Sequence, residues 1–231
     1  MRLVTGSKNY SSWTMRVWLA MRFFDIPFEE VKIALNRPDT AEHIARYSPS
    51  GRIPCLVLDE QAIWDSMSIC EYLAERFPHK HLWPQDAKRR AHARSICAEM
   101  HAEFSALRRA LHLNICGRDA AAGKREMCIA AVKQDVQRIE RIWEQCLTQY
   151  GGPFLFGELS IADAYFIPMV LRFRTYELPV SSQAVADYMD RVEYLKPVQE
   201  WIASAAKSSG ADLPISQRLP LCGHSASLPA E

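Results

Sequence analysis

Hydroxyl side chains gather near the start of the chain, in the segment Asn9-Tyr-Ser-Ser-Trp-Thr14. The segment follows a short apolar run, residues 2–5, and stands where a helical pattern begins. A helix N-terminus exposes unpaired N–H groups and the positive end of the peptide dipoles. A hydroxyl placed there can donate a hydrogen bond to an anion that the same field attracts. Ser11 and Ser12 are therefore candidates for holding an anion, or for simply capping the helix.

Two later junctions carry polar groups that could bind the rest of a ligand. Proline is common and trans at the start of a strand, where Pro54 stands. A cis bond would instead turn the Ile53 backbone outward, where its N–H and C=O could pair with an extended ligand. Asp65 and Ser66 stand between an apolar run and a helical pattern. Ser66 can cap that helix, or the pair can hold the ammonium and carboxylate ends of an amino acid.

A fourth motif, Gly157-Glu-Leu-Ser-Ile-Ala-Asp163, has the spacing of a capping box between Ser160 and Asp163. We interpret this motif as structural, because the box would start a buried helix. A substitution in it is expected to damage folding rather than chemistry.

Short apolar runs alternate with helical patterns over the first eighty residues and predict the elements that position these groups. Strands are expected at 2–5, 28–35, 54–58 and 62–64, and helices at 12–24, 40–46 and 66–77. The order β-α-β-α-β-β-α predicts an α/β domain of the thioredoxin-like type over residues 1–78. Residues 79–85, rich in proline and polar side chains, are expected to be a linker.

From residue 86 onward the pattern is helical throughout, and no strand is expected. Helices are expected at about 86–114, 125–149, 160–173, 184–192 and 195–207, with a polar turn at 117–123. Residues 86–207 are therefore predicted to form an all-helical C-terminal domain. Residues 208–231 turn to Ser, Pro, Gly and Ala, and a loose surface tail is expected there.

Composition narrows the classes of function. The chain has 231 residues and a formal net charge of +1, which argues against a dedicated nucleic-acid binder. No targeting segment and no membrane span are expected. The seven cysteines lack the spacing of a zinc site or a disulfide framework, so buried free thiols are expected, as at Cys70 and Cys128. The protein is therefore expected to reside in a reducing compartment, the cytoplasm. It is also expected to bind no metal.

In their order and spacing, these motifs resemble the soluble glutathione transferase superfamily over residues 1 to about 205. The matching segments are the Ser-bearing turn after the first strand, Pro49-Ser-Gly-Arg-Ile-Pro54, Trp64-Asp-Ser-Met-Ser-Ile-Cys-Glu-Tyr-Leu73 and Gly157-x-x-Ser-Ile-Ala-Asp163. The segment Tyr10–Val17 is also similar to the Ser-Ser-Cys motif of the zeta class, the maleylacetoacetate isomerases. Trp13 stands in this chain where that motif has its cysteine.

The resemblance implies a role for each matching residue. Ser11, or its neighbour Ser12, would hydrogen-bond the sulfur of glutathione. Ile53 would pair its backbone with the cysteinyl unit, with Pro54 cis. Asp65 and Ser66 would bind the γ-glutamyl end, and Arg52 would lie near the glycyl carboxylate.

The resemblance also implies a pocket for a second substrate, a small electrophile, lined by the helical domain. Its candidate residues are Tyr10, Trp13, Arg108, Arg109, Arg172 and Arg174. These arginines indicate a carboxylate-bearing co-substrate, although any one of them can equally be a solvated surface residue. The expected protein is a homodimeric glutathione transferase, with a zeta-like isomerase and a non-catalytic binding protein as alternatives.

Overall fold

The computed structural model describes residues 1–35, 37–59 and 61–208. Its N-terminal part consists of β1 (Arg2–Thr5), α1 (Ser12–Phe23), β2 (Glu29–Lys32), α2 (Thr40–Ala45), β3 (Cys55–Leu58), β4 (Gln61–Ile63) and α3 (Ser66–Arg76). The four strands form one sheet in the order β2-β1-β3-β4. β1 is parallel to β2 and antiparallel to β3, and β3 is antiparallel to β4. The predicted β-α-β-α-β-β-α order is confirmed.

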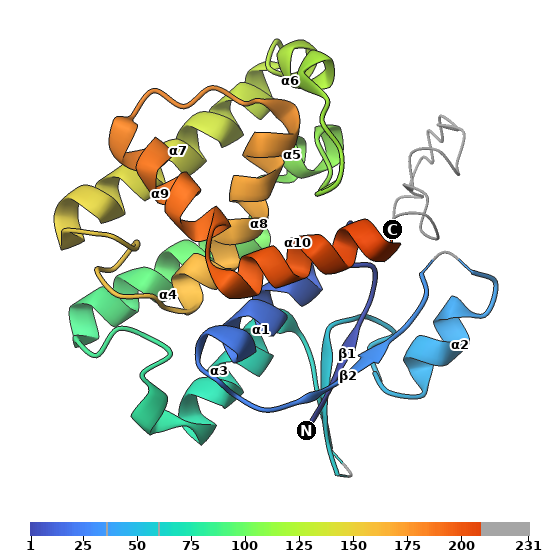
Figure 1. Cartoon of the computed structure of the whole chain (residues 1–231). Helices are drawn as coiled ribbons and strands as arrows, with labels where there is room; N and C mark the ends of the chain where they lie inside the picture. Colours follow the sequence, from blue (N-terminus) through green and yellow to red (C-terminus); the bar gives the residue numbers. More distant parts are fainter. Residues whose placement is uncertain (36, 60, 209–231) are drawn as a thin grey trace, which may run out of the picture.

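The buried side chains of the strands belong to two different layers. Leu3 and Leu56 belong to the large core that contains α1, α3 and the helical domain. Their strand neighbours Val4 and Cys55 pack with Ile44 of α2 on the opposite face. Figure 1 shows α1 and α3 on one side of the strands and α2 on the other. This alternation is the two-residue period of a strand covered on both faces.

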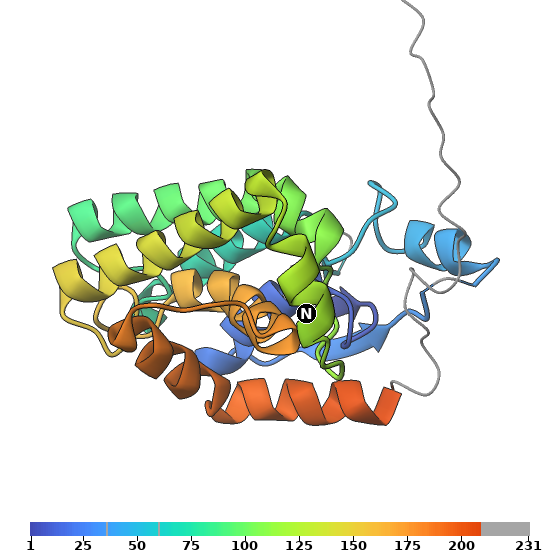
Figure 2. The ribbon, with the colours of Figure 1, turned by 90° about the horizontal axis from the view of Figure 1, so that it is seen from above.

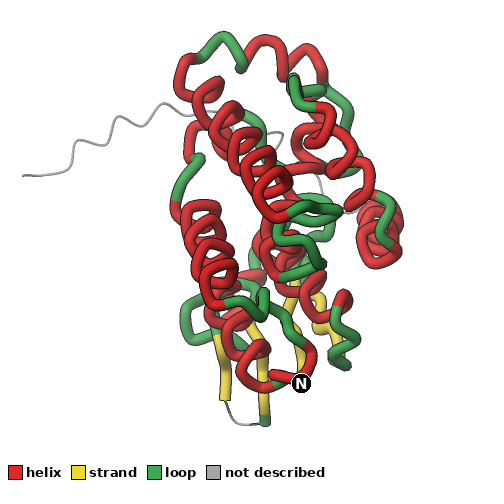
Figure 3. Tube along the Cα trace, turned by 90° about the vertical axis from the view of Figure 1, so that its left-hand side faces the viewer, coloured by secondary structure: helices red, strands yellow, loops and turns green. Residues whose placement is uncertain are grey.

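A short 3-10 helix, η1 (Pro78–Lys80), leads into the helical part. That part consists of α4 (Ala87–Ala102), α5 (Ser105–Ala110), α6 (Ala120–Glu126), α7 (Ala130–Tyr150), α8 (Ile161–Tyr176), α9 (Gln183–Glu193) and α10 (Lys196–Ser208). Figure 3 shows the strands gathered at one end of the molecule and the helices beyond them. The expected tail lies outside the described residues, except for its first residue, which ends α10.

The last helix returns to the N-terminal part, as the views from two directions show (Figures 1 and 2). The Trp201 indole N–H donates to the Lys8 carbonyl at 2.8 Å. The Lys8 ammonium lies 4.4 Å from the Trp18 ring and 4.8 Å from the Trp201 ring, and pairs with Glu30 at 3.1 Å. These contacts hold the turn between β1 and α1, which carries the first motif.

The single long helix expected at 86–114 is wrong. Phe104 adopts φ 62°, in the left-handed region, and its side chain is buried. The break divides the segment into α4 and α5. The Asp135 carboxylate of α7 accepts the Leu107 backbone N–H at 3.0 Å and so holds the first turn of α5. A contact from a distant helix thus decides where this helix starts.

The polar turn expected at 117–123 is also wrong at its second half, where α6 begins at Ala120 after an Asp119 cap. Gly123 is a helical residue in close contact with α8. A Cβ added to it would lie 1.9 Å from the Tyr176 carbonyl oxygen. The glycine therefore serves helix packing rather than a turn, although both uses look alike in a sequence.

The capping box is present as predicted. The Ser160 hydroxyl accepts the Ala162 N–H at 3.2 Å, and the Asp163 carboxylate accepts the Ser160 N–H at 2.9 Å. The helix that it starts, α8, is buried along almost its whole length. Among the described residues, no helix is long and apolar enough to cross a membrane. Cys70 is buried as expected, whereas Cys128 is exposed because the loop before α7 leaves it at the surface.

Candidate active site

A cavity of about 480 Å³ lies where α1, α3 and α4 meet the loop before β3. The residues that line it come from four separate segments: Trp13, Ser50, Arg52, Ile53, Pro54, Trp64, Asp65, Ser66 and His101. Six of the residues predicted from the sequence therefore line a single cavity. The N-termini of α1 and α3 both stand at it, so their free N–H groups favour negative charge there.

Asp65 is the cap of α3, rather than Ser66 as the sequence suggested. Its Oδ1 accepts the Met67 N–H at 2.9 Å and the Ser68 N–H at 3.4 Å. Ser66 is instead fully buried, with its hydroxyl 3.3 Å from the Tyr165 hydroxyl of α8. The Oδ1 atom of Asp65 therefore satisfies two N–H groups at the start of α3. Its Oδ2 atom lies 3.0 Å from Nε2 of His101.

His101 stays largely uncharged beside this carboxylate at neutral pH. Burial, helped by the charges of Arg16 and Arg108, lowers the pKa of His101 in spite of Asp65. A neutral imidazole can donate a hydrogen bond but does not neutralise the carboxylate. Asp65 therefore keeps a negative charge at the cavity that an ammonium group of a ligand can pair with.

Ile53 presents unused backbone groups to the same cavity. The Ile53–Pro54 peptide bond is cis. Within the described part of the chain, neither the N–H nor the C=O of Ile53 takes part in a hydrogen bond. Arg52, beside it, is exposed at the edge of the cavity.

Ser11 caps α1 and does not itself line the cavity. Its oxygen accepts the Thr14 N–H at 3.3 Å, and its O–H donates to the Thr14 Oγ1 at 2.8 Å. Ser12 is the first residue of α1 and is half-buried. Trp13, the next residue, does line the cavity. Both hydroxyls thus stand within one turn of it, with Ser11 in the capping role that the sequence left open.

Comparison with known proteins identifies the family of this chain. The glutathione S-transferase N-terminal domain family matches residues 10–76, and the C-terminal domain family matches residues 126–204. The chain is 33% identical over 179 residues to the maleylacetoacetate isomerase of Pseudomonas aeruginosa, covering 74% of this chain and 80% of that one. It belongs to the glutathione S-transferase family.

Solved structures of this family share the fold. A glutathione transferase homologue from Burkholderia gl BGR1, solved with bound glutathione, gives a TM-score of 0.67 at 22% identity, over 90% of this chain and 98% of that one. Maleyl pyruvate isomerase, a bacterial zeta-class enzyme solved in its holo form, gives 0.68 at 19% identity, over 88% and 98% of the two chains.

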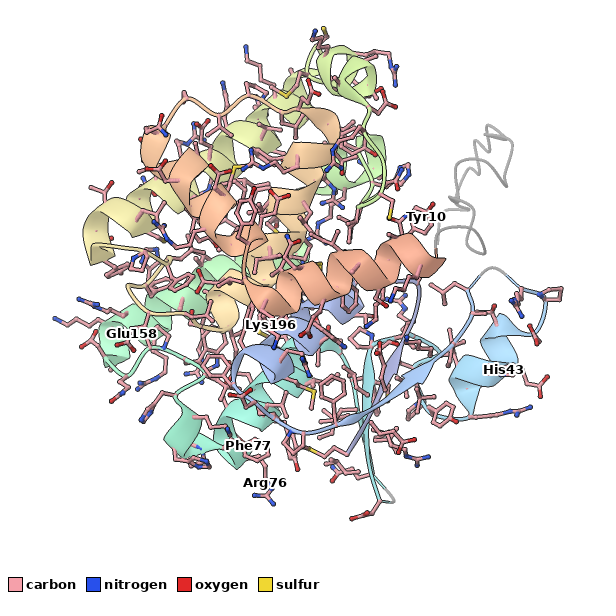
Figure 4. All side chains as sticks on the ribbon, in the orientation of Figure 1. Tyr10, His43, Arg76, Phe77, Glu158 and Lys196 are labelled. Atoms are coloured by element: carbon pink, nitrogen blue, oxygen red, sulfur yellow. The ribbon has the colours of Figure 1, made fainter. Side chains whose placement is uncertain are left out.

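The helical domain separates the predicted pocket arginines into two groups. Arg108 lies 5.1 Å from the Trp13 ring, and Arg172 is buried. Arg109 is exposed, and Arg174 pairs with Asp190 and Glu193 on the surface. Figure 4 labels Tyr10 on the turn before α1, and Tyr10 does not line the cavity. Of the four predicted pocket arginines, Arg108 and Arg172 are the two that lie away from the surface.

Sequence reasoning missed Ser50, Trp64, His101 and Arg16. His101 stands on a helix whose pattern marks no special role, so only its contact with the Trp13 ring, at 4.9 Å between ring centres, reveals it. A signal was available for Arg16, a charged residue inside the apolar face of α1. Among the described residues, no three His, Cys, Asp or Glu side chains are grouped to hold a metal ion.

Proposed function

We propose that this protein binds glutathione and activates its thiol as a thiolate for attack on a small electrophile. The observation that carries the proposal is one cavity that joins the Asp65 carboxylate, unused backbone groups and the N-terminus of α1, whose two hydroxyls stand within one turn of it. These are the groups that a tripeptide with an ammonium end, an extended middle and a thiol requires. The family supports the same ligand.

In the proposed complex, Asp65 pairs with the ammonium group of the γ-glutamyl unit. The γ-glutamyl carboxylate lies at the start of α3, where the Ser66 backbone N–H has no partner among the described residues. The N–H and C=O of Ile53 pair with the cysteinyl unit as a sheet edge would. Arg52 then faces the glycyl carboxylate.

The sulfur lies at the start of α1 in this complex. A thiol with a pKa near 8.5 is mostly protonated at neutral pH, and the thiolate is the nucleophile. A serine is far too weak a base to remove this proton, so Ser11 acts by donating its O–H to the sulfur anion. Lowering the thiol pKa by one to two units requires about 1.4–2.7 kcal/mol, within the range of one charge-assisted hydrogen bond. Ser11 must turn its proton from Thr14 to the sulfur, and Ser12 is the alternative donor.

Ser11→Ala and Ser12→Ala, made separately, test this role. The variant that loses the donor should raise the pKa of bound glutathione by about one unit or more, because the thiolate loses its hydrogen bond. Its turnover of a generic electrophile at pH 7 should fall about tenfold. The pKa is measured from the ultraviolet absorbance of the thiolate against pH. If glutathione bound to the unmodified protein keeps an ordinary thiol pKa, the proposed thiol activation is contradicted. The protein would then bind glutathione without activating it.

A zeta-like isomerase is the second candidate, favoured by the 33% identity to a maleylacetoacetate isomerase. The thiolate would add to a cis double bond, the bond would rotate, and elimination would return glutathione unchanged. A maleyl diketo acid incubated with catalytic glutathione distinguishes the two functions. Isomerised product with no loss of glutathione indicates the isomerase, and a stable adduct formed with loss of glutathione indicates the transferase.

We also propose that the protein works as a homodimer, as the family resemblance implies, and in the cytoplasm, a reducing compartment that suits its free cysteines.

A further inference from the structure

Two titratable side chains, His101 of α4 and Asp65 of α3, meet at the cavity. Nε2 of His101 lies 3.0 Å from Oδ2 of Asp65, and both residues line the cavity. The Trp13 ring of α1 packs against the imidazole in an edge-on geometry, with 4.9 Å between the ring centres. Contacts from two other helices therefore hold the imidazole beside the carboxylate that the ammonium group of glutathione needs.

The two carboxylate oxygens of Asp65 serve different purposes. Oδ1 accepts the N–H groups of Met67 and Ser68 and is committed to the start of α3. Oδ2 faces His101, and the side chain of Asp65 is 48% exposed. Oδ2 is therefore the oxygen that is left for an ammonium group of a ligand, and the ligand must share this oxygen with His101.

The surroundings of the His101 ring favour its neutral form. A carboxylate can only accept hydrogen bonds, so Nε2 of His101 carries the proton of the neutral imidazole. Nδ1 is buried and has no hydrogen-bond partner among the described residues. A second proton on Nδ1 would create a charged, buried N–H group without an acceptor, and such a group is costly.

Charged groups from three other helices act on the imidazole. Asp65 of α3 favours the protonated ring, whereas Arg16 of α1 and Arg108 of α5 oppose it. Burial is the largest influence, and together with the two arginines it lowers the pKa of His101 below its usual 6.5. The ring therefore gains its positive charge only as the pH falls into the mildly acidic range.

We propose that His101 is a positioning residue that acts on the ammonium group of glutathione through Asp65. The neutral ring donates Nε2–H to Oδ2 and fixes the carboxylate for the ligand. The protonated ring becomes a competing cation at the same oxygen, and it repels the ammonium group. This inference rests on the proposed function and adds a dependence of affinity on pH, because a proton and a ligand that compete lower each other's affinity by the same factor.

Calorimetric titration with S-methylglutathione between pH 7 and pH 5 tests the competition. This probe has no thiol to ionise, and its carboxyl groups, with pKa values of about 3.3–3.7, and its amino group, at about 7.7–8.0, keep their charges over the range. We expect the affinity of the unmodified protein to fall about fivefold to tenfold from pH 7 to pH 5, since one competing proton weakens binding by at most about tenfold per pH unit. An affinity that stays constant over this range overturns the inference.

Two variants of His101 separate its hydrogen bond from its charge. His101→Ala removes the donor and should weaken binding at pH 7 by about twofold to tenfold, the worth of one hydrogen bond. His101→Gln keeps an N–H group for Asp65 but cannot be protonated. It should therefore bind more tightly than His101→Ala at pH 7 and lose the dependence on pH. Equal binding by the two variants, or a dependence on pH that survives in His101→Gln, overturns the inference.

The matched control is His92→Gln, the same change on the same helix. The His92 ring contacts the Tyr150 hydroxyl at 2.7 Å and does not line the cavity. This variant should keep the pH dependence of the unmodified protein. Loss of the dependence in His92→Gln as well would contradict a specific role for His101.

Nuclear magnetic resonance measures the competition from the side of the proton. The imidazole signal of His101 is identified by its absence from the spectrum of His101→Gln. Saturation with S-methylglutathione should lower the pKa of His101 by about one unit, the reciprocal of the effect on affinity. An unchanged pKa in the saturated protein overturns the inference while glutathione binding stands. If S-methylglutathione does not bind at pH 7, the proposed function itself is contradicted and this inference with it.

Discussion

Asp163→Ala is expected to lower the free energy of unfolding by about 3–5 kcal/mol, the range for breaking a buried charged network. The Asp163 carboxylate is fully buried and accepts the N–H groups of Leu155 and Ser160 at 3.1 and 2.9 Å. The hydroxyls of Ser160 and Tyr188 donate to it as well, each at 3.3 Å. Alanine would leave four buried donors without an acceptor, and each unsatisfied group costs about 1–3 kcal/mol.

Urea unfolding followed by circular dichroism measures this loss. The matched control is Asp86→Ala, which removes an exposed cap of α4 whose carboxylate accepts the Arg89 N–H at 2.8 Å. That variant should lose only about 1 kcal/mol. Comparable losses in the two variants would show that burial adds nothing to the capping box of α8.

Asp163 also makes stability depend on pH. Burial raises the pKa of its carboxyl to about 6, from 3.8 for an exposed aspartate. Between these two values the folded protein holds a proton that the unfolded chain has released, so this group favours folding more as the pH falls from about 6 to about 4. The gain is at most about 3 kcal/mol, is fully present below about pH 4, and is lost as the pH rises through 6.

Comparison of the unmodified protein with Asp163→Asn separates the contribution of the Asp163 carboxyl to the pH dependence of stability from that of all other titrating groups. The stability advantage of the unmodified protein over the variant should grow as the pH is lowered from 7 to 4. An advantage that grows toward high pH would instead mean that the four donors hold the carboxyl ionised.

Asp65→Asn is expected to weaken glutathione binding by about tenfold to a hundredfold. Asparagine caps a helix about as well as aspartate, so α3 should keep its cap and the protein its stability. The variant removes the negative charge that pairs with the γ-glutamyl ammonium, and a hydrogen bond to a charged group contributes about 1.5–3 kcal/mol. Isothermal titration calorimetry with glutathione measures the effect.

Asp86→Asn is the matched control, because it makes the same change at the helix cap of α4, outside the cavity. Its glutathione affinity should equal that of the unmodified protein. An unchanged affinity in Asp65→Asn would remove this carboxylate from the proposed binding site and leave it a structural cap.

The order of helices and strands could be predicted from the sequence because it depends on periodicity within each segment. The capping box was equally accessible, since Ser160 and Asp163 are three residues apart and contact one another within a single turn. The predictions that failed concern positions where another element intervenes. Asp135 of α7 holds the start of α5, and the Tyr176 carbonyl of α8 explains Gly123.

The residues of the candidate site likewise fall into those that local sequence patterns mark and those that only tertiary packing reveals. Ser11, Ile53, Asp65 and Ser66 stand at helix and strand ends, which local patterns mark, and the family resemblance assigned their roles. The choice of Asp65 over Ser66 as the cap of α3 required the structure, because Ser66 is drawn into the interior beside Tyr165. His101 was not predicted, since it reaches the cavity only through the packing of α4.

The sequence by itself determined the two-part architecture, the helix ends that meet at the cavity and the buried start of α8. Each of these depends on residues within a few positions of one another, where backbone geometry limits the possible contacts. Only the tertiary structure decided that Arg16, Arg108 and Arg172 share one buried cluster, while Arg109 and Arg174 remain at the surface. Every arginine carries the same charge in the sequence, and it is burial beside distant residues that determines whether that charge is solvated, paired or left without a partner.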